Sequence, residues 1–304
     1  MSVRTHVAVA LGIALVVGGG AGCAPAREVA RTGSPASIAL MTDFGASDFY
    51  VGAVKGVIRS IAPAVTIDDL AHQLEPYDVR GAAWNLYLAA REYPPGTIIV
   101  AVVDPGVGTA RRPIVLRTHD SRFFVGPDNG IFTFIAERLG PVEVRHVANA
   151  SLFRPGTISH SFHTRDVFAP VAAHLAAGTP FAAVGPIIKD YVMLPVQPAN
   201  LGKGEVTGAV ITIDHYGNLH TNIPGEMLAA LTLKQGDQVD VTIGDVTKSV
   251  RLVSTYGDVP AGEPLVFIAS TEHLEVAVNM GSAQSLFAAK VNASVRLTPH
   301  RGRE

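Results

Sequence analysis

Apolar runs and amphipathic stretches alternate along the first part of the chain. The apolar runs are short and rich in β-branched residues, so they predict buried strands, expected at 37–42, 64–70, 97–103 and 113–116. The longer amphipathic stretches predict helices, expected at 51–62, 78–93 and 166–178. Strands that alternate with helices indicate a mostly parallel sheet covered on both faces. We therefore expect an α/β N-terminal domain over residues 38–195.

The pattern changes after this domain. Residues 196–204 are rich in Pro and Gly and predict a linker. Beyond it, turn residues separate short apolar segments, which lie at 208–217, 238–244, 248–257, 263–270, 274–281 and 293–299. Closely spaced short strands are typical of a barrel or a sandwich. We expect a smaller all-β, barrel-like C-terminal domain over residues 205–298, followed by a tail at 299–304.

The N-terminus has the pattern of an export signal. Residues 7–17 form an apolar run that is short for a membrane span. Small residues follow it up to Cys23, the single cysteine of the chain, so no disulfide can form within one chain. This order resembles a bacterial lipoprotein signal. We expect a signal peptide at 1–23, lipidation at Cys23 and a tether at 24–37, which would give an exported, membrane-anchored protein facing the periplasm or the cell exterior. Plain secretion and an uncleaved anchor are the alternatives.

Composition limits the classes of partner. The chain has 304 residues and is 48% hydrophobic, which allows a sizeable core. Its formal net charge is −2, so it has no basic excess with which to neutralise phosphates. We therefore expect no nucleic-acid partner, and contact with a membrane only through the N-terminal anchor.

Acidic turns follow several of the predicted strands. Asp43 lies in TDFG, Asp104 lies in DPGVG, and Asp128 and Asn129 lie in GPDNG. In a parallel sheet, ligands bind beyond the carboxyl ends of the strands, so these side chains are candidates for one site. Ordinary turn chemistry is the alternative, because Asp and Asn bond their own backbone and Gly supplies positive φ. Several such turns in one domain strengthen the case for a site without excluding turn chemistry.

Common cofactor motifs do not fit these turns. The segment GVGTAR has Arg111 at the third glycine position of the dinucleotide fingerprint, and it lacks the Lys-Ser/Thr ending of a phosphate-binding loop. In HSFHTRD, the spacing of His160, His163 and Asp166 could suit a metal ion on a helix. No clear second cluster of ligands completes such a set, so we expect no metal.

A series of motifs carries a resemblance to a known family. The motifs are TDFG, YVGAVKGVI, DDLAHQLEPYDVRGAA, VVDPGVGTARR, GPDNG, SFHTRDVFAP, DHYGN and LEVAVNMGSA. Over residues 38–298 the chain resembles the adenosine-forming S-adenosylmethionine (SAM) hydrolases, also called SAM hydroxide adenosyltransferases, which are related to fluorinases and chlorinases. The resemblance implies an α/β N-terminal domain and a C-terminal β-barrel. It also implies a homotrimer that binds SAM where one subunit's N-terminal domain meets a neighbour's C-terminal domain.

The resemblance implies hydrolysis of SAM to adenosine and L-methionine by in-line attack of water or hydroxide on C5′. The family's water-handling residues fall on Asp104, Arg111 and His163 of this chain. The sulfonium leaves as a neutral thioether, so no general acid is needed. Asp104 and His163 can accept or relay the proton, and Arg111 can hold Asp104 ionised or stabilise a hydroxide-like nucleophile. SAM is the substrate, and no cofactor is expected. Arg112 is the better candidate for a surface salt bridge.

Substrate-binding residues in the N-terminal domain are also implied by the resemblance. Asp43 is expected to bind the ribose hydroxyls. Tyr77 is expected to pack on the ligand, and its ring would also favour the sulfonium cation. Asn129 is a further binding candidate. His72 matches the family and is expected to have only a structural role.

The remaining binding residues implied by the resemblance fall in the C-terminal domain. Asp214 is expected to hold the methionine ammonium. Tyr216 is expected to stack on adenine, and Asn218 is expected to bond to the edge of the same base. Ser270 and Asn279 fall in the region that binds the methionine carboxylate and adenine.

Two other functions stay open at this point. A halogenase would use chloride or fluoride as the nucleophile, but halogenating relatives carry a TYPATG-like turn in place of DPGVG and an inserted loop after it, which favours water here. An extracytoplasmic protein that binds adenosine or SAM without turnover is the other alternative. The set of Asp104, Arg111 and His163 argues against simple binding.

Overall fold

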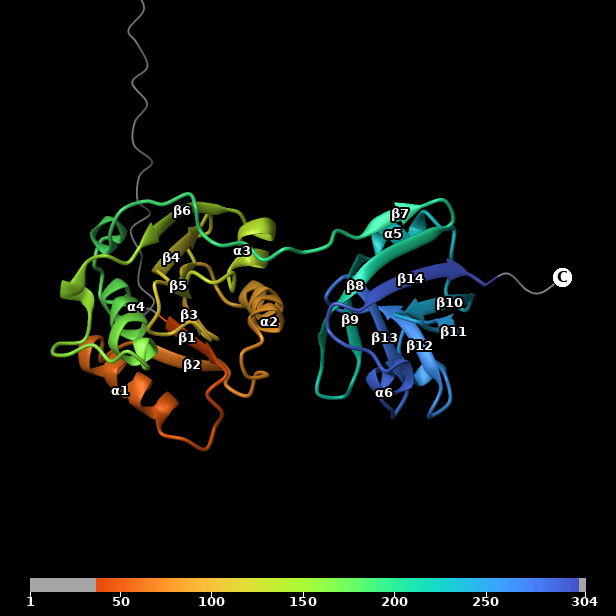
Figure 1. The fold of residues 1–304 in the computed structure, drawn as a ribbon, viewed down its shortest axis with the longest axis horizontal. Coiled ribbons are helices and arrows are strands. Elements are labelled where there is room, and N and C mark those ends of the chain that lie inside the picture. Colours follow the sequence, from red (N-terminus) through yellow and green to blue (C-terminus); the bar gives the residue numbers. More distant parts are fainter. Residues whose placement is uncertain (1–36, 301–304) are drawn as a thin grey trace, which may run out of the picture. The chain divides into compact units, whose positions relative to one another are not determined.

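The structure, a computed structural model, describes residues 37–300. The predicted signal peptide, the lipidation at Cys23 and nearly all of the tether lie outside the described residues. Within residues 37–300, no helix is both long and apolar enough to cross a membrane. The fold class predicted from the sequence is confirmed, because an α/β domain is followed by a β-barrel (Figure 1).

A six-stranded, mostly parallel sheet forms the centre of the N-terminal domain. Its strands, in spatial order, are β2 (Thr66–Ala71), β1 (Ser37–Thr42), β3 (Ile98–Val102), β5 (Phe123–Pro127), β4 (Pro113–Thr118) and β6 (Pro141–His146). The pairings from β2 to β5 are parallel, whereas β4 is antiparallel to both of its neighbours. The carboxyl ends of β1, β3 and β5 therefore meet at one edge of the sheet.

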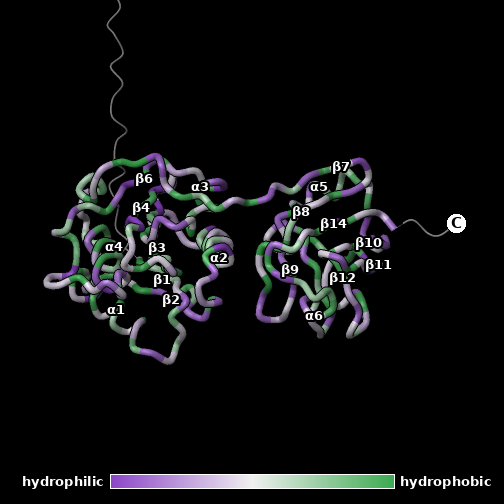
Figure 2. Tube along the Cα trace, viewed as in Figure 1, coloured by the Kyte–Doolittle hydropathy of each residue, from purple (hydrophilic) through white to green (hydrophobic). Residues whose placement is uncertain are grey.

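Each face of this sheet has its own apolar core. On one face, Ile38 and Leu40 of β1 pack with α1 (Tyr50–Ile61) and α4 (Ala169–Ala176). On the other face, Ala39 and Met41 pack with α2 (Val79–Glu92) and α3 (Thr133–Arg138). Figure 2 colours β1 and β3 as hydrophobic stretches. Burial on both faces explains why these strands are continuous apolar runs in the sequence.

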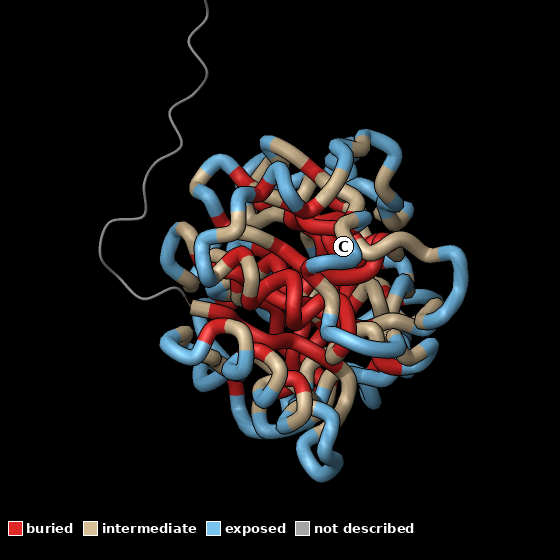
Figure 3. Tube along the Cα trace, turned by 90° about the vertical axis from the view of Figure 1, so that its left-hand side faces the viewer, coloured by how far each residue is buried: buried red, intermediate tan, exposed pale blue. Residues whose placement is uncertain are grey.

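The C-terminal domain is a closed barrel. Its strands, in spatial order, are β14 (Ser294–Pro299), β10 (Gln238–Ile243), β11 (Val246–Leu252), β12 (Pro264–Ile268), β13 (His273–Val278), β9 (Leu219–Pro224) and β8 (Glu205–Ile213). The pairing of β14 with β8 closes the barrel, and only β11 and β12 pair in parallel. The short helices α5 (Glu226–Ala229) and α6 (Ala283–Phe287) lie in its connections. Figure 3, viewed from the left-hand side of Figure 1, shows buried segments at the centre and exposed segments mainly at the periphery.

Two strands of this domain differ from the sequence expectations. The strand β7 (Asn200–Gly202) pairs with β8 inside the segment expected to be a linker. The strand β9 was not expected, because Thr221 and Asn222 interrupt its apolar pattern although both are buried. Thr221 Oγ1 donates to the carbonyl of Leu274 at 2.8 Å, and Asn222 Oδ1 accepts from the amide of Ala209 at 2.8 Å. Buried polar groups with such partners are compatible with a strand that hydropathy alone does not reveal.

Candidate active site

The fold brings the predicted N-terminal site residues together. Asp43 follows β1, and Asp104 follows β3, its parallel neighbour in the sheet. Both residues line a pocket of about 630 Å³ together with Tyr77 and His163. The strand-end acids of β1 and β3 therefore belong to one site, as the sequence suggested.

The Arg111 guanidinium joins Asp104 to His163. Its Nε donates to Asp104 Oδ1 at 3.1 Å, its Nη2 donates to Asp104 Oδ2, and the same Nη2 lies 3.0 Å from His163 Nδ1. The Asp104 and Arg111 side chains are only 5% and 7% exposed, and the Phe168 ring lies against the guanidinium. Arg111 Nη1 is buried and has no hydrogen-bond partner within residues 37–300. A buried donor of this kind suits a water or hydroxide oxygen.

Gly108 fixes the turn that carries Asp104. Its φ is +78°, and a Cβ at this position would lie 2.4 Å from the carbonyl oxygen of His160. Glycine satisfies both the left-handed backbone and this close approach. The contact joins the DPGVG turn to the segment that carries His163.

The hydrogen bond from Arg111 defines the tautomer of His163. A guanidinium only donates, so Nδ1 must accept and the ring proton lies on Nε2. Burial lowers the pKa of His163, and the Arg111 charge lowers it further, while Asp104 and Asp166 oppose the shift. The imidazole is therefore neutral at pH 7. In this state its Nε2–H can orient an oxygen nucleophile, whereas Nδ1 is occupied by Arg111.

A buried carboxylate anchors the backbone on both sides of His163. Asp166 lies in a π-helical turn, Thr164–Phe168, that starts directly after His163 and leads into α4. Its oxygens accept from Arg165 Nε and Nη2 at 2.6 and 2.8 Å and from the amide of Ser159 at 2.9 Å. Burial alone would raise the pKa of Asp166, but these hydrogen bonds lower it below its ordinary value. Asp166, considered from the sequence only as a metal ligand, is an ion-pair partner of Arg165.

Tyr77 has a left-handed backbone beside the pocket. Its φ is +67°, and its amide donates to Asp43 Oδ2 at 3.1 Å. The next residue, Asp78, caps α2 by accepting from the amide of Gly81 at 2.9 Å. A non-glycine residue in this region costs roughly 1–3 kcal/mol and is typical of functional sites. Here the strained conformation holds the Asp43 carboxylate and leaves the Tyr77 ring 74% exposed.

Aromatic side chains that sequence analysis missed form part of the wall of this pocket. Phe44, Phe49, Tyr50 and Phe162 all line it, and ring centroids in contact within this group are 4.6–6.3 Å apart. Phe162 is far along the chain from the other three. Spacing in the sequence therefore gives no signal that groups them.

The residues predicted to contact adenine gather in a second pocket, of about 420 Å³, in the barrel domain. Tyr216, Asn218 and Asn279 line it, and so does Tyr256, which sequence analysis did not identify. Asp214 shapes the adjacent turn, because its Oδ1 accepts from the amides of Tyr216 and Asn218, both at 2.9 Å. The pocket therefore has an exposed tyrosine ring, which could stack on adenine, beside side-chain amides, which could bond to the edge of that base.

Three predicted binding residues lie outside the linings of these two pockets, namely Asp214, Asn129 and Ser270. Asn129 Nδ2 donates to the carbonyl of Val103 at 2.9 Å, and its Oδ1 accepts from the amide of Ile131 at 3.2 Å. Ser270 is exposed in a turn after β12. Their roles in binding stay predictions.

Arg112 has the structural role expected of it. It forms ion pairs with Asp128 at 2.7 Å and with Asp190 at 3.0 Å. Asp128 Oδ1 also accepts from the amide of Val192 at 2.7 Å. The acid at the end of β5 therefore holds Arg112 and the backbone at Val192, and it is not part of the pocket that Asp43 and Asp104 line.

Asp214, His220 and Glu275 have a spacing that could suit a metal ion. One potential ligand atom from each lies within 4.8 Å of the others. These groups already have protein partners, because His220 lies 3.4 Å from Asp214 and 3.5 Å from Glu275, and the Tyr256 hydroxyl donates to Glu275 at 2.6 Å. Burial raises the pKa of Glu275. The cluster links the Asp214 turn to the Tyr256 wall of the second pocket.

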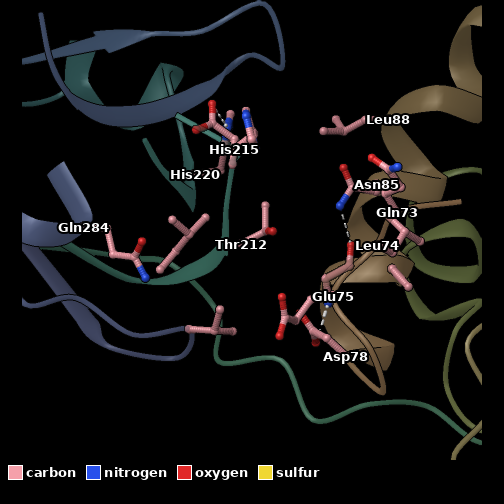
Figure 4. Close-up of a pocket in the computed structure, with 15 residues that line it drawn as sticks. Gln73, Leu74, Glu75, Asp78, Asn85, Leu88, Thr212, His215, His220 and Gln284 are labelled. Carbon is pink, nitrogen blue, oxygen red and sulfur yellow. Dashed lines mark hydrogen bonds and ion pairs between the residues drawn. The ribbon is translucent and has the colours of Figure 1, made fainter. Parts of the chain in front are cut away.

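Figure 4 shows a further pocket, of about 650 Å³. Its labelled lining includes Glu75, Asp78 and Asn85 on one wall and Thr212 and His220 on the other. The lining contains Asp214 but neither Asp104 nor His163. This pocket is therefore separate from the Asp104–Arg111–His163 group.

Comparison with known proteins gives matches over both domains. Residues 38–185 match the SAM hydroxide adenosyltransferase N-terminal domain, and residues 208–296 match the C-terminal domain of the same family. The chain is 39% identical over 266 residues to the (R)-S-adenosyl-L-methionine hydrolase of Thermus thermophilus, covering 85% of this chain and 98% of that protein. Identity to the (R)-S-adenosyl-L-methionine hydrolase of Salinispora tropica is 38%, covering 86% of this chain and 97% of the relative.

A fluorinase and a solved structure are also similar. The fluorinase of Actinoplanes sp. is 30% identical over 289 residues, covering 86% of this chain and 97% of that enzyme. The crystal structure of an uncharacterized conserved protein from Thermotoga maritima superposes with a TM-score of 0.83 at 39% identity, covering 86% of this chain and 99% of the other. With both domains matched in order, the chain belongs to the SAM hydroxide adenosyltransferase family.

Proposed function

We propose that this protein hydrolyses SAM to adenosine and L-methionine. The observation that carries the proposal is the buried Asp104–Arg111–His163 group beside a pocket lined by Asp43 and Tyr77. The names of two similar curated relatives support it, since both are SAM hydrolases. They also specify the (R) form, and we propose the same sulfonium configuration for the substrate of this chain.

The reaction places a water or hydroxide oxygen between the catalytic group and C5′. The oxygen forms a bond to C5′ while the bond from C5′ to sulfur breaks. The electron pair of the broken bond stays on the methionine sulfur. His163 donates from Nε2 and Arg111 from Nη1 to hold the oxygen, and Asp104 accepts the proton that water loses. Positioning contributes much of the rate, because the sulfonium is already a good leaving group.

The charge of the site favours water over a halide. The Asp104 carboxylate lines the pocket, where it can accept a proton from water, and a halide has no proton to give. The fluorinase relative is also less similar than the hydrolases, at 30% against 38–39% identity. Both observations place halogenation second.

The direct test is incubation of the purified protein with each sulfonium form of SAM. We expect the (R) form to give equal amounts of adenosine and methionine, measured by liquid chromatography and mass spectrometry. Chloride in place of other salts is expected to yield no 5′-chloroadenosine. Tight binding of adenosine or SAM without turnover of either form would instead favour a binding protein.

The activity is expected to fall in acid as His163 becomes charged. The pKa of His163 lies below its ordinary value of 6.5. The neutral imidazole that accepts from Arg111 is therefore present at pH 7 and is lost only when the pH falls below 6.5. We expect kcat to be constant from neutral to mildly alkaline pH and to fall with a midpoint below pH 6.5. A pH–rate profile from pH 4.5 to 8.5 measures this. An acid limb whose midpoint lies above pH 6.5 would be incompatible with the assigned tautomer.

We further propose a homotrimer with substrate sites shared between subunits. Asp43 and Tyr77 line a pocket in the N-terminal domain, whereas Tyr216, Asn218 and Asn279 line a pocket in the barrel domain. Tyr77 and Tyr216 are 74% and 75% exposed. We expect light scattering to give three times the chain mass, and specific activity to decline on dilution below the dissociation constant of the trimer. A fully active monomer would contradict shared sites.

Export and anchoring by a lipid on Cys23 complete the proposal. Its support is the apolar run that ends in small residues and the single cysteine. Mass spectrometry of the protein from membranes of the native host is expected to show a mature N-terminus at Cys23 carrying a diacylglycerol. A soluble protein that keeps Met1 would contradict it.

A further inference from the structure

His72 is part of a side-chain network behind the Asp43 turn. Lys55 Nζ donates to Asp69 Oδ2 at 2.6 Å, Asp69 Oδ1 lies 2.9 Å from His72 Nε2, and His72 Nδ1 lies 2.8 Å from the hydroxyl of Thr42. Thr42, the residue before Asp43, is 3% exposed. The network connects α1, the end of β2 and the end of β1.

The hydrogen bonds of this network run in one direction when His72 is neutral. The Asp69 carboxylate accepts from Nε2–H, and Nδ1 accepts from the Thr42 hydroxyl. Burial alone would raise the pKa of Asp69, but the hydrogen bonds from Lys55 and His72 lower it below its ordinary value. The Thr42 oxygen then accepts from the amide of Phe44 at 3.3 Å.

These bonds fix the backbone on both sides of Asp43. The bond from the Phe44 amide to Thr42 Oγ1 closes a turn with Asp43 as its central residue. The carbonyl oxygen of His72 accepts from the amide of Gly45 at 2.7 Å and holds the far end of the same loop. His72 therefore contacts the turn through its ring and through its backbone.

A register shift between β1 and β2 brings His72 to this position. Leu40 pairs with Asp69, but the next residue, Met41, pairs with Ala71, so Leu70 is an extra residue on β2. The following residues are then Thr42 and His72, which are the two that bond. Irregularities of this kind commonly re-aim side chains next to active sites.

We propose that Thr42 and His72 are positioning residues that set ribose selectivity by orienting Asp43. The inference rests on the proposed binding of the ribose hydroxyls by Asp43. The Asp43 carboxylate is held from one side by the Tyr77 amide and from the other by the turn that Thr42 closes. A carboxylate fixed in this way can accept from two vicinal hydroxyls, but a mobile one loses that advantage.

The experiment compares binding of adenosine and 2′-deoxyadenosine to the purified full-length protein by calorimetry. Wild-type protein is expected to bind adenosine about 10- to 100-fold more tightly, as for hydrogen bonds to a charged group. Thr42→Val keeps the side-chain shape but removes the hydroxyl, and we expect it to reduce this ratio to about threefold or less. Thr42→Ser restores the hydroxyl and is expected to recover the ratio.

A second variant tests the hydrogen bond between Thr42 and His72 by changing His72. His72→Gln places an amide where Nε2 donates to Asp69 and leaves the Thr42 hydroxyl without its acceptor, so it is expected to lower the ratio as Thr42→Val does. Because the ratio compares two ligands on one folded protein, a general loss of stability does not change it. The deoxyadenosine affinity is expected to stay near that of the wild type.

The outcomes separate this inference from the proposed function. Wild-type protein that binds both nucleosides equally would overturn the ribose role of Asp43 and the inference together. Wild-type discrimination that persists in both Thr42→Val and His72→Gln would overturn the inference alone. Loss of the ratio in both variants and its recovery in Thr42→Ser would support it.

Discussion

Asp104→Asn is expected to lower kcat by about 100- to 10,000-fold while KM changes little. The amide has the same shape as the carboxylate, but it cannot take the proton that water loses in the transition state. It also weakens the pairing with the buried Arg111 guanidinium, which is only 7% exposed. Steady-state assay of adenosine release gives both constants, and circular dichroism checks that the variant is folded.

Asp43→Asn is the matched control for this substitution. Both residues follow neighbouring strands and line the same pocket. Ribose contacts exist in the ground state and in the transition state alike, so we expect Asp43→Asn mainly to raise KM. If Asp104→Asn keeps the wild-type kcat, the carboxylate only shapes the DPGVG turn.

His163→Ala is expected to cause a loss of kcat in the same range, about 100- to 10,000-fold. The Arg111 Nη2 atom contacts both Asp104 and His163, so removal of either partner disturbs the other. For this reason the double variant Asp104→Asn/His163→Ala is expected to be little slower than the slower single variant. Single-turnover kinetics would measure the chemical step in all three proteins.

His160→Ala is the control for this position. His160 lies in the same segment, but it is exposed, and the hydrogen-bond partners of the Arg111 guanidinium within residues 37–300 are Asp104 and His163. We therefore expect wild-type kcat. Losses that multiply in the double variant would show that Asp104 and His163 act independently.

The sequence predicted that the acids at the strand ends lie close together, because the carboxyl ends of parallel strands meet at one edge of the sheet. Continuous apolar runs marked β1 and β3 as buried parallel strands, and parallel strands place Asp43 and Asp104 at one edge. Spacing alone could not separate them from Asp128, which follows β5 in the same way. The structure separates them by position, since Asp43 and Asp104 line one pocket, whereas Asp128 lies outside it and pairs with Arg112.

Residues whose bonding partners are distant in the sequence could not be predicted from apolar runs and strand ends. Tyr256 joins the second pocket through the folding of the barrel, and its hydroxyl bonds Glu275 of β13. Glu275 lies between the apolar residues Leu274 and Val276 of β13, and its charge alone does not indicate its partner. The bond from Thr42 to His72 could not be predicted from the sequence, because it depends on the register shift between β1 and β2.

The most direct measurement is hydrolysis of SAM in water enriched in oxygen-18. Attack on C5′ transfers the label to the 5′ oxygen of adenosine and leaves methionine unlabelled, and mass spectrometry distinguishes the two. We predict one labelled oxygen in each adenosine formed by the wild-type protein. Unlabelled adenosine, or label in methanol released from the S-methyl group, would contradict attack of water on C5′.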